Sequence, residues 1–345
     1  TVSANATELI WKENEDQILY ASDAQASDEF GWSVSIDGDY AIVGSYKEDT
    51  GGSNAGAVYI FKRDGTSWSQ QQIIHASDAQ TNDQFGQSVG ISGDYAIVGA
   101  IYEDSGAADG GSAYIYKRDT STDVWGSEQH ITASNAGSSD YFGHSVSIDG
   151  DYAIVGANGE NSASGAVYIF KRDGTSWSEI AQGPIIASDT QVVDEFGWDV
   201  GISGDYAIVG SRNEDTGGTD AGAAYIYVRS GTTWSEQQKI QSSDIQAGDS
   251  FGGAVAIDGD YVTVGANYED ENGTSAGAVY IFKRDGTTWT QEAKLLPSDG
   301  TGGDELSYGG SIDISGNTVV VGARVADPGG ISNAGAAYIF ERSGT

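Results

Sequence analysis

The chain has 345 residues, 38% of them hydrophobic, with 50 glycines, 3 prolines and no cysteine, so no disulfide contributes to its stability. Its 16 basic and 51 acidic residues give a net charge of −35, and a field of that sign repels nucleic acids and anionic membranes, which excludes both as partners. No stretch reaches the roughly 18 consecutive apolar residues of a transmembrane helix, so we expect no direct insertion into a membrane.

Four short strands, here called A to D, are predicted in the first part of the chain. Strand A covers about 33–36, and a tight Asp-Gly turn of the hairpin type joins it to strand B at 40–44. Strand C, at 57–63, is apolar on both faces, which is typical of a strand buried between two neighbouring sheets. A second glycine turn leads to strand D at about 67–74.

This four-strand unit recurs six times in the same order, at intervals of about 55 residues. Its most regular marker is a Phe-Gly dipeptide, found at 30–31, 85–86, 142–143, 196–197 and 251–252, with Tyr308-Gly309 as the sixth copy. Four antiparallel strands repeated radially are the arrangement of a β-propeller. We therefore predict an all-β fold, one six-bladed β-propeller over 1–345, with repeats at about 21–75, 76–132, 133–186, 187–241, 242–296 and 297–345.

The two chain ends favour a closed ring over a superhelical solenoid. The last repeat stops at 343–345, where its strand D should begin. The first complete repeat is preceded by an orphan segment, 8–20, whose Trp11 corresponds to Trp68 in the next strand D. We therefore expect 8–20 to supply strand D of the sixth blade and to close the ring.

The sequence FGxSVxIxGDYAIVGA, followed by GAVYIF, resembles the FG-GAP repeat, the unit of the integrin α-subunit propeller. It is similar above all to the bacterial-type variant, in which an acidic SDxxxxDxFG segment precedes the Phe-Gly. The resemblance covers essentially the whole chain. It implies a propeller, a secreted or cell-surface location, and a role in binding or adhesion.

One departure from the family concerns calcium. Integrin-type units carry a DxDxDG loop between strands A and B, whereas this chain has only Asp37-Gly38-Asp39 there. Two carboxylates on a tight turn do not supply the roughly six to eight oxygens that calcium prefers. We therefore expect no calcium at the A–B turns.

The D–A and B–C connections share one face of a propeller with this strand order, and both carry carboxylates here. We therefore expect an acidic loop face that binds the ligand. The candidate ligand-binding carboxylates of the B–C loops are Glu48, Asp49, Glu103, Asp104, Glu214, Asp215, Glu269 and Asp270.

The D–A loops carry an SDxxxxD pattern, whose two aspartates lie five residues apart. The candidate metal ligands are Asp23, Asp28, Asp78, Asp83, Asp140, Asp189, Asp194, Asp244, Asp249, Asp299 and Asp304, with Asn135 replacing the first aspartate of the third copy. Two interpretations stay open. Such an aspartate accepts backbone N–H bonds and fixes the turn, or the pair holds calcium, the one cofactor expected, together with loop carbonyls and a B–C carboxylate.

Two tryptophans stand out because they follow Phe-Gly in only two copies. Trp32 and Trp198 occupy a position that is Gln, His or Gly in the other four. Ligand contacts are usually added at a variable position on a fixed frame. An exposed Trp there would stack on a sugar ring, whereas the strand D tryptophans recur in every blade and are expected to pack.

The sequence gives little support for catalysis. The three histidines occupy different repeat positions, and the chain has no cysteine nucleophile and no GxSxG elbow. Carboxylates are abundant, so a glycosidase with a pair of aspartates stays open. An enzyme, however, needs an asymmetric constellation, whereas these carboxylates repeat almost identically. We therefore expect that the chain is not an enzyme.

Charge and resemblance together predict a secreted or cell-surface binding module. A high-salt or calcium-rich extracellular setting relieves the self-repulsion of so many carboxylates. The expected partner is a glycan or an extracellular protein. The alternative is a structural building block of an extracellular filament or surface layer, which would self-assemble.

Overall fold

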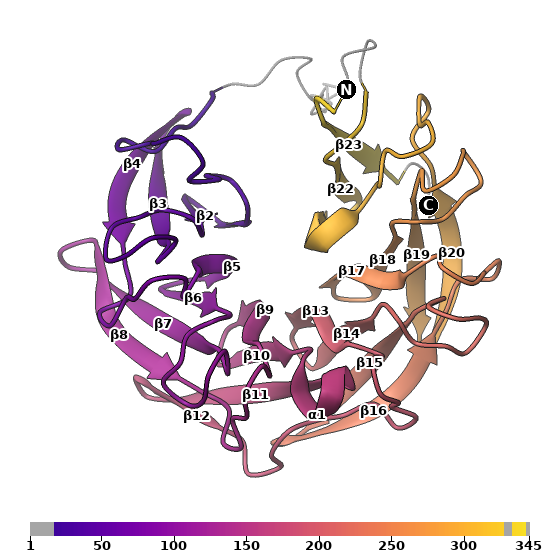
Figure 1. The fold of residues 1–345 in the computed structure, drawn as a ribbon, viewed down its shortest axis with the longest axis horizontal. Coiled ribbons are helices and arrows are strands. Elements are labelled where there is room, and N and C mark those ends of the chain that lie inside the picture. The colour runs from indigo at the N-terminus through magenta and orange to yellow at the C-terminus, as the bar shows by residue number, and fades with distance from the viewer. Residues whose placement is uncertain (1–16, 328–332, 343–345) are drawn as a thin grey trace, which may run out of the picture.

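The structure is a computed structural model that describes residues 17–327 and 333–342. It confirms the predicted architecture: six small antiparallel sheets stand around a common centre, as in a six-bladed β-propeller (Figure 1). Five sheets have four strands, and the sixth has three within the described residues. No helix in this part of the chain is long and apolar enough to span a membrane.

The strands follow the same order in every blade, with strand A innermost and strand D outermost (Figure 1). Blade 1 consists of β1 (Val34–Asp37), β2 (Tyr40–Ser45), β3 (Ala57–Asp64) and β4 (Ser67–Ile74). Each strand begins and ends within one residue of its predicted bounds.

The other blades repeat this plan. Blade 2 has β5 (Phe85–Ser92), β6 (Tyr95–Ala100), β7 (Ser112–Asp119) and β8 (Val124–Ile131), and blade 3 has β9 (Phe142–Asp149), β10 (Tyr152–Ala157), α1 (Glu160–Ala163), β11 (Ala166–Asp173) and β12 (Ser176–Glu179). Blade 4 has β13 (Phe196–Ser203), β14 (Tyr206–Ser211), β15 (Ala223–Ser230) and β16 (Thr233–Ile240), and blade 5 has β17 (Phe251–Asp258), β18 (Tyr261–Ala266), β19 (Ala278–Asp285) and β20 (Thr288–Leu295). Blade 6 has η1 (Tyr308–Gly310), β21 (Ile312–Ser315), β22 (Thr318–Ala323) and β23 (Ala336–Glu341).

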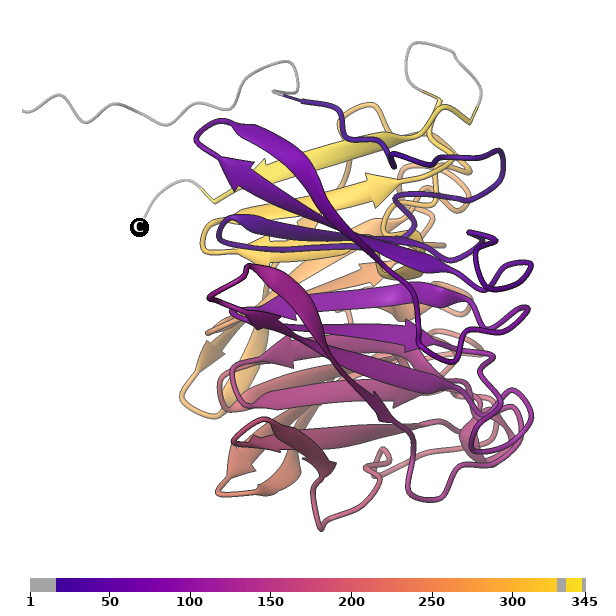
Figure 2. The same ribbon diagram turned by 90° about the vertical axis from the view of Figure 1, so that its left-hand side faces the viewer.

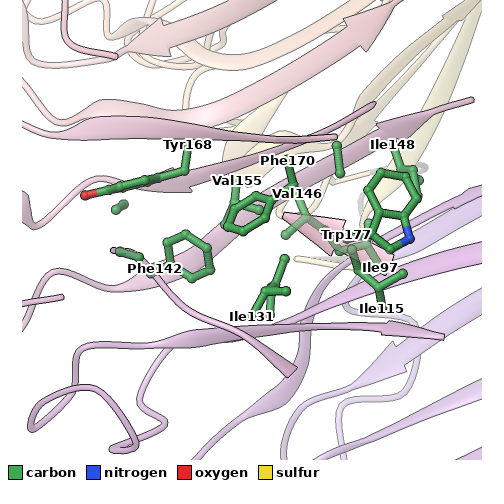
Figure 3. Close-up of a cluster of buried hydrophobic side chains, with 14 of the residues drawn as sticks. Ile97, Ile115, Ile131, Phe142, Val146, Ile148, Val155, Tyr168, Phe170 and Trp177 are labelled. Atoms are coloured by element: carbon green, nitrogen blue, oxygen red, sulfur yellow. The ribbon is translucent and has the colours of Figure 1, made fainter. Parts of the chain in front are cut away.

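The hydrophobic core lies between neighbouring blades, which explains why strand C is apolar on both faces. Between blades 2 and 3, Phe142 meets the edges of Tyr168 and Phe170, and Trp177 packs on Tyr95 with ring centroids 5.6 Å apart (Figure 3). Stacked sheets bury both faces of their middle strands, so each repeat must carry two apolar faces rather than one.

A glycine before strand C links each of blades 1 to 4 to the Phe-Gly marker of the next blade. Gly165 forms a parallel bridge with Phe196, and the same bridge joins Gly56 to Phe85. Gly165 has a φ of +84°, and a Cβ at this position would lie 2.0 Å from the carbonyl oxygen of Phe196. Only glycine allows the two backbones to approach this closely.

A glutamine clamp also joins successive strands D. The side chain of Gln72 donates to the carbonyl of Trp125 at 2.6 Å and accepts the N–H of Trp125 at 2.9 Å. The clamp recurs as Gln129 with Trp177, Gln182 with Trp234 and Gln238 with Trp289. Gln17 makes it with Trp68, at 2.6 and 2.7 Å. Gln17 thus takes the place of a strand D residue, while 8–16 of the predicted closing strand lie outside the described residues.

An apolar seam faces the gap between blades 6 and 1 at the top of Figure 1. On blade 1, Val34 and Ile36 are 68% and 59% exposed, although the same repeat positions are buried in blades 2 to 4. On blade 6, Val320 and Ile339 are 42% and 51% exposed. These are the side chains that pack against each other at the other blade interfaces, so the seam is one unclosed interface of the same kind.

Candidate binding site on the loop face

The two rims of the propeller differ in the length of their connections. Long D–A and B–C connections gather on one rim, where α1 also lies, and short A–B and C–D turns form the other (Figure 2). We call the rim with the long connections the loop face. All the candidate site residues predicted from the sequence lie on it or at the adjoining strand ends.

The second aspartate of each SDxxxxD pattern is buried and bonded to its own loop. Asp28 accepts the N–H of Gln25 at 2.7 Å, three residues earlier. The equivalent bond is made by Asp83, Asp140, Asp194, Asp249 and Asp304. Burial raises the pKa of Asp83 to about 6, and neighbouring carboxylates add to the effect. In each blade this side chain holds the loop by a backbone bond.

The first aspartate has a different partner, the hydroxyl of the strand C tyrosine. Tyr59 donates to Asp23 and Tyr114 donates to Asp78, both at 2.9 Å. Tyr225 donates to Asp189 in the same way, and Tyr168 donates to Asn135 in blade 3. Asp299 interacts with the Tyr338 hydroxyl. The two aspartates of a pair thus bond to separate groups.

The B–C carboxylates also have partners within their own loops. Glu48 is buried and accepts the N–H of Thr50, and Asp49 accepts the N–H of Asn54. The buried glutamates Glu103, Glu214 and Glu269 accept the N–H two residues on, and Asp104, Asp215 and Asp270 accept the N–H five residues on. These bonds order the long loops.

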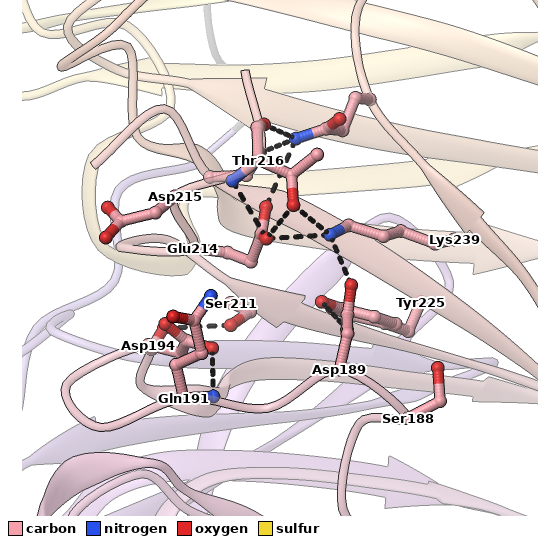
Figure 4. A network of polar contacts seen from close by, with 12 residues as sticks. Ser188, Asp189, Gln191, Asp194, Ser211, Glu214, Asp215, Thr216, Tyr225 and Lys239 are labelled. Atoms are coloured by element: carbon pink, nitrogen blue, oxygen red, sulfur yellow. Dashed lines mark hydrogen bonds and ion pairs between the residues drawn. The ribbon is translucent and has the colours of Figure 1, made fainter. Parts of the chain in front are cut away.

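Lysines on strand D neutralise the acidic groups in two blades. In blade 4 the ammonium of Lys239 lies 2.8 Å from Asp189 and 2.7 Å from Glu214 (Figure 4). In blade 5 Lys294 lies 2.7 Å from Asp244 and 2.8 Å from Glu269. A protein cation therefore stands between the two carboxylates at this place.

In the first A–B turn, where no calcium was expected, both aspartates bond to protein groups. Asp37 accepts the N–H of Gly93 in the next blade at 2.6 Å, and Asp39 pairs with Arg63 at 2.7 Å. These bonds tie the turn to the next blade and to strand C.

The loop face also carries non-repeating residues close to the propeller axis, which we call the inner ring. Of these residues, the sequence indicated only Trp32 and Trp198. Each blade contributes the residue after Phe-Gly, at the start of innermost strand A, and the first residue after strand B. The pairs, from blade 1 to blade 6, are Trp32 and Tyr46, Gln87 and Ile101, His144 and Asn158, Trp198 and Arg212, Gly253 and Asn267, and Gly310 and Arg324. This ring is asymmetric, although the frame that carries it repeats.

The two tryptophans of the inner ring differ in their exposure. Trp32 is 45% exposed and rests against Tyr46, with ring centroids 4.8 Å apart. Trp198 is covered by the guanidinium of Arg212, 3.2 Å from its ring centroid, and Glu195 holds that guanidinium at 2.6 Å. Of the two, Trp32 therefore offers the open aromatic face.

Two amides of the inner ring have oxygens without a hydrogen-bond partner. They are the buried Oε1 of Gln87 and the buried Oδ1 of Asn158, whose residue is only 6% exposed. Buried polar atoms are normally bonded, and a buried water is the partner that fits a site of this size. Gln87 and Asn158 lay outside the sequence-based candidates; the signal that points to them is variation on a fixed frame.

Asp199, next to Trp198, departs from the serines found at its position in blades 1 to 3. Ser33 and Ser88 donate to the Phe-Gly glycine carbonyl of the next blade, both at 2.8 Å. Asp199 instead accepts the N–H of Val255 in blade 5 at 2.7 Å and that of Val200 at 3.0 Å. Its carboxyl thus lies on the innermost strands, beside the inner ring.

The burial of the Asp199 carboxyl leads us to expect a stability that depends on pH. Burial raises its pKa to about 7, against about 3.9 in an unfolded chain. Between these values only the folded state holds the proton, so the free energy of unfolding falls as the pH rises from about 4 to about 7. Asp199→Asn removes this titration. We expect the variant to gain about 2–3 kcal/mol relative to the wild type between about pH 5 and pH 8, measured by urea unfolding. Identical pH profiles for the two proteins would contradict the assignment.

The six radial sheets, the Phe-Gly linkage and the loop-face frame define a propeller built from one repeat. A family model described as the FG-GAP repeat matches the chain at 14–61, 68–116, 125–170, 177–227, 234–282 and 289–340. The chain belongs to the FG-GAP repeat family. No curated protein matches it significantly.

Solved structures with a similar fold include two proteins named as lactonases. A candidate 6-phosphogluconolactonase from Bacteroides fragilis is 14% identical, with a TM-score of 0.59 over 91% of this chain and 80% of that one. The periplasmic gluconolactonase of Pseudomonas aeruginosa is 15% identical, with a TM-score of 0.53 over 90% of this chain and 85% of that one. Identities this low show a shared fold.

These neighbours correct the expectation that the chain is not an enzyme. That expectation assumed that a six-fold repeat presents only repeated groups, yet similar propellers carry the names of enzymes. The inner ring shows why the assumption was wrong: the repeat supplies a frame, and the residues after Phe-Gly and after strand B differ from blade to blade.

Proposed function

We propose that this protein is an extracellular binding module that recognises a hydroxyl-rich glycan at its inner ring, around Trp32 and Gln87. The observation that carries the proposal is the half-exposed ring of Trp32, at a position that changes in every neighbouring blade. A flat aromatic face packs well against the apolar face of a sugar ring. A role in adhesion follows if the glycan belongs to a cell surface.

The residue that replaces Trp32 in the neighbouring blade supports a ligand that forms hydrogen bonds. Gln87, at the equivalent position of blade 2, is partly exposed and carries an amide that can donate to and accept from sugar hydroxyls. The net charge of −35 disfavours acidic glycans. The preferred ligand class is therefore a neutral glycan.

The test is a glycan array probed with the wild-type protein, in millimolar calcium and in EDTA. Trp32→Ala should weaken binding of any neutral glycan about tenfold, because stacking on an aromatic ring is worth roughly 1–1.5 kcal/mol. Tyr20→Ala, which removes an exposed aromatic ring outside the inner ring, should leave binding unchanged. Equal losses in both variants, or no binding by the wild type, would end the glycan proposal. Binding that occurs in calcium but is lost in EDTA would show that glycan recognition also requires calcium.

The unclosed apolar seam favours a second candidate function, a building block of an extracellular assembly. The exposed Val34 and Ile36 of blade 1 would associate with Val320 and Ile339 of a second copy. A concentration-dependent mass in light scattering, abolished by Val34→Asp, would support assembly. A protein that stays monomeric at all concentrations would contradict assembly and leave glycan binding as the one proposed function.

A further inference from the structure

The D–A aspartate and the B–C glutamate of one blade face a common point, which we call the cation socket. In blades 4 and 5 this point is taken by the ammonium groups of Lys239 and Lys294. In blade 3 the aspartate is replaced by Asn135, so a single carboxylate remains. The net charge of the side chains at the socket therefore differs from blade to blade.

Blade 2 keeps both carboxylates and has a histidine where the lysine stands. His130 pairs with Tyr114 across the strands, as Lys239 pairs with Tyr225. Its Nδ1 lies 3.3 Å from Asp78, and its Nε2 lies 3.7 Å from Glu103. The three side chains place ligand atoms within 4.8 Å of one another.

A second departure from the repeat accompanies the histidine. Position 112 is serine in blade 2, whereas Ala57, Ala166, Ala223, Ala278 and Ala336 stand there in the other blades. Ser112 donates its hydroxyl proton to Glu103 at 2.6 Å, and its oxygen lies 2.7 Å from Nε2 of His130. Serine and histidine thus form one unit that is absent from the other five blades.

The hydrogen bonds of Ser112 fix the proton on the imidazole. A hydroxyl has one proton, and Glu103 accepts it, so Ser112 can only accept from His130. Nε2 therefore carries the N–H, and Nδ1 is left facing a carboxylate oxygen of Asp78. A bare lone pair beside a carboxylate is repulsive, so either a second proton on Nδ1 or a metal ion must lie between these two atoms.

We propose that Asp78, Glu103 and the Nδ1 of His130 bind one divalent metal ion of the zinc class. One imidazole and two carboxylates are a donor set that zinc accepts. Two ligands about 2.1 Å from a tetrahedral zinc lie roughly 3.4 Å apart, close to the 3.3 Å between Nδ1 and Asp78. The bond from Nε2 to Ser112 is the outer contact that typically orients a metal-bound histidine.

The surroundings of the site suit a metal ion. The side chains of Asp78 and His130 are 38% and 26% exposed, so an ion can enter from solvent. The ring of Tyr114 stacks on His130 with a centroid distance of 4.6 Å and an interplanar angle of 12°, which holds the imidazole in place. Asp83 and Asp104 add negative charge nearby. This inference does not depend on the glycan proposal.

The test is isothermal titration of the metal-free protein with zinc chloride, with calcium chloride as a second probe and cobalt absorption as a spectroscopic readout. We expect one zinc per chain, a visible cobalt band, and binding at least tenfold tighter for zinc than for calcium. His130→Lys copies the lysine of blade 4 and should weaken zinc binding at least 100-fold while the protein stays folded. Ser112→Ala copies the other blades and should weaken it about tenfold, as loss of an outer contact does.

Three outcomes would overturn the proposal. Zinc binding that survives His130→Lys would place the ion elsewhere. Calcium binding as tight as zinc binding would exclude a role for the imidazole. A wild-type protein that binds no zinc, with both nitrogens of His130 protonated in ¹⁵N spectra, would show that the socket holds a proton instead.

Discussion

Replacing Gly165 with alanine should lower the free energy of unfolding by more than about 4 kcal/mol, which places it among the most damaging single substitutions. Two costs add at this residue. Its φ of +84° is strained for any residue with a Cβ. The new Cβ would also lie 2.0 Å from the oxygen and 2.6 Å from the nitrogen of Phe196. These are backbone atoms, so relief requires the blades to move apart.

Gly174→Ala is the matched control for Gly165→Ala. Gly174 lies in the same blade with a φ of +64°, and a Cβ there would meet nothing within 4 Å. Only the backbone strain applies, so we expect a loss of about 1–2 kcal/mol. Urea unfolding of both variants measures the difference. Losses of equal size would show that the contact between blades 3 and 4 at Phe196 contributes little.

The fold was predictable because the four-strand pattern occurs six times in the sequence. A single YAIVG segment is compatible with many kinds of sheet. Six copies are compatible only with a radial arrangement of blades, because Phe-Gly and a strand D tryptophan recur at fixed distances from YAIVG. Strand D of blade 1, Ser67–Ile74, begins and ends as predicted. Packing on both faces of strand C followed from its apolar pattern, and the buried Tyr59 and Ile60 show it.

The candidate site was less predictable, because spacing does not reveal a carboxylate's partner. Asp23 and Asp28 lie five residues apart, yet Asp23 accepts from Tyr59 and Asp28 accepts from Gln25. The repeat pattern pointed to the carboxylates that all blades share as the candidate site. The structure shows that these carboxylates bond to nearby protein groups. The inner ring depends on contacts between segments far apart in sequence, such as Asp199 with Val255. Such contacts appear only when blades are placed side by side.

Removing the side chain of Trp11 is the second change with a large expected effect. At the four successive interfaces from blade 1 to blade 5, a strand D tryptophan packs beside the strand B tyrosine of the preceding blade. Trp289, for example, lies 5.9 Å from Tyr206 between ring centroids. A pocket of about 240 Å³ lies at the same place between blades 5 and 6, lined by Tyr261, Phe340 and Arg342 among others. Arg342 lies over Tyr261 as Arg284 lies over Tyr206. The pocket therefore offers the same flanking tyrosine and arginine as a tryptophan slot.

We propose that Trp11 fills this pocket and that residues 8–16 complete the sixth blade. Trp11→Ala should then cost about 3–5 kcal/mol in urea unfolding, as Trp→Ala does in a core, and Trp125→Ala should cost a similar amount. Ile18→Ala, at an exposed residue seven positions further along the chain, should change stability by less than about 0.5 kcal/mol.

A chain that begins at residue 17 gives an independent test of the same strand. It should regain stability when a peptide of residues 1–16 is added, and an alanine-11 peptide should not restore it, because main-chain pairing alone does not fill the pocket. If Trp11→Ala is neutral and the peptide has no effect, the sixth blade stands with three strands. The exposed Val320 and Ile339 would then be a permanent apolar edge that needs another partner.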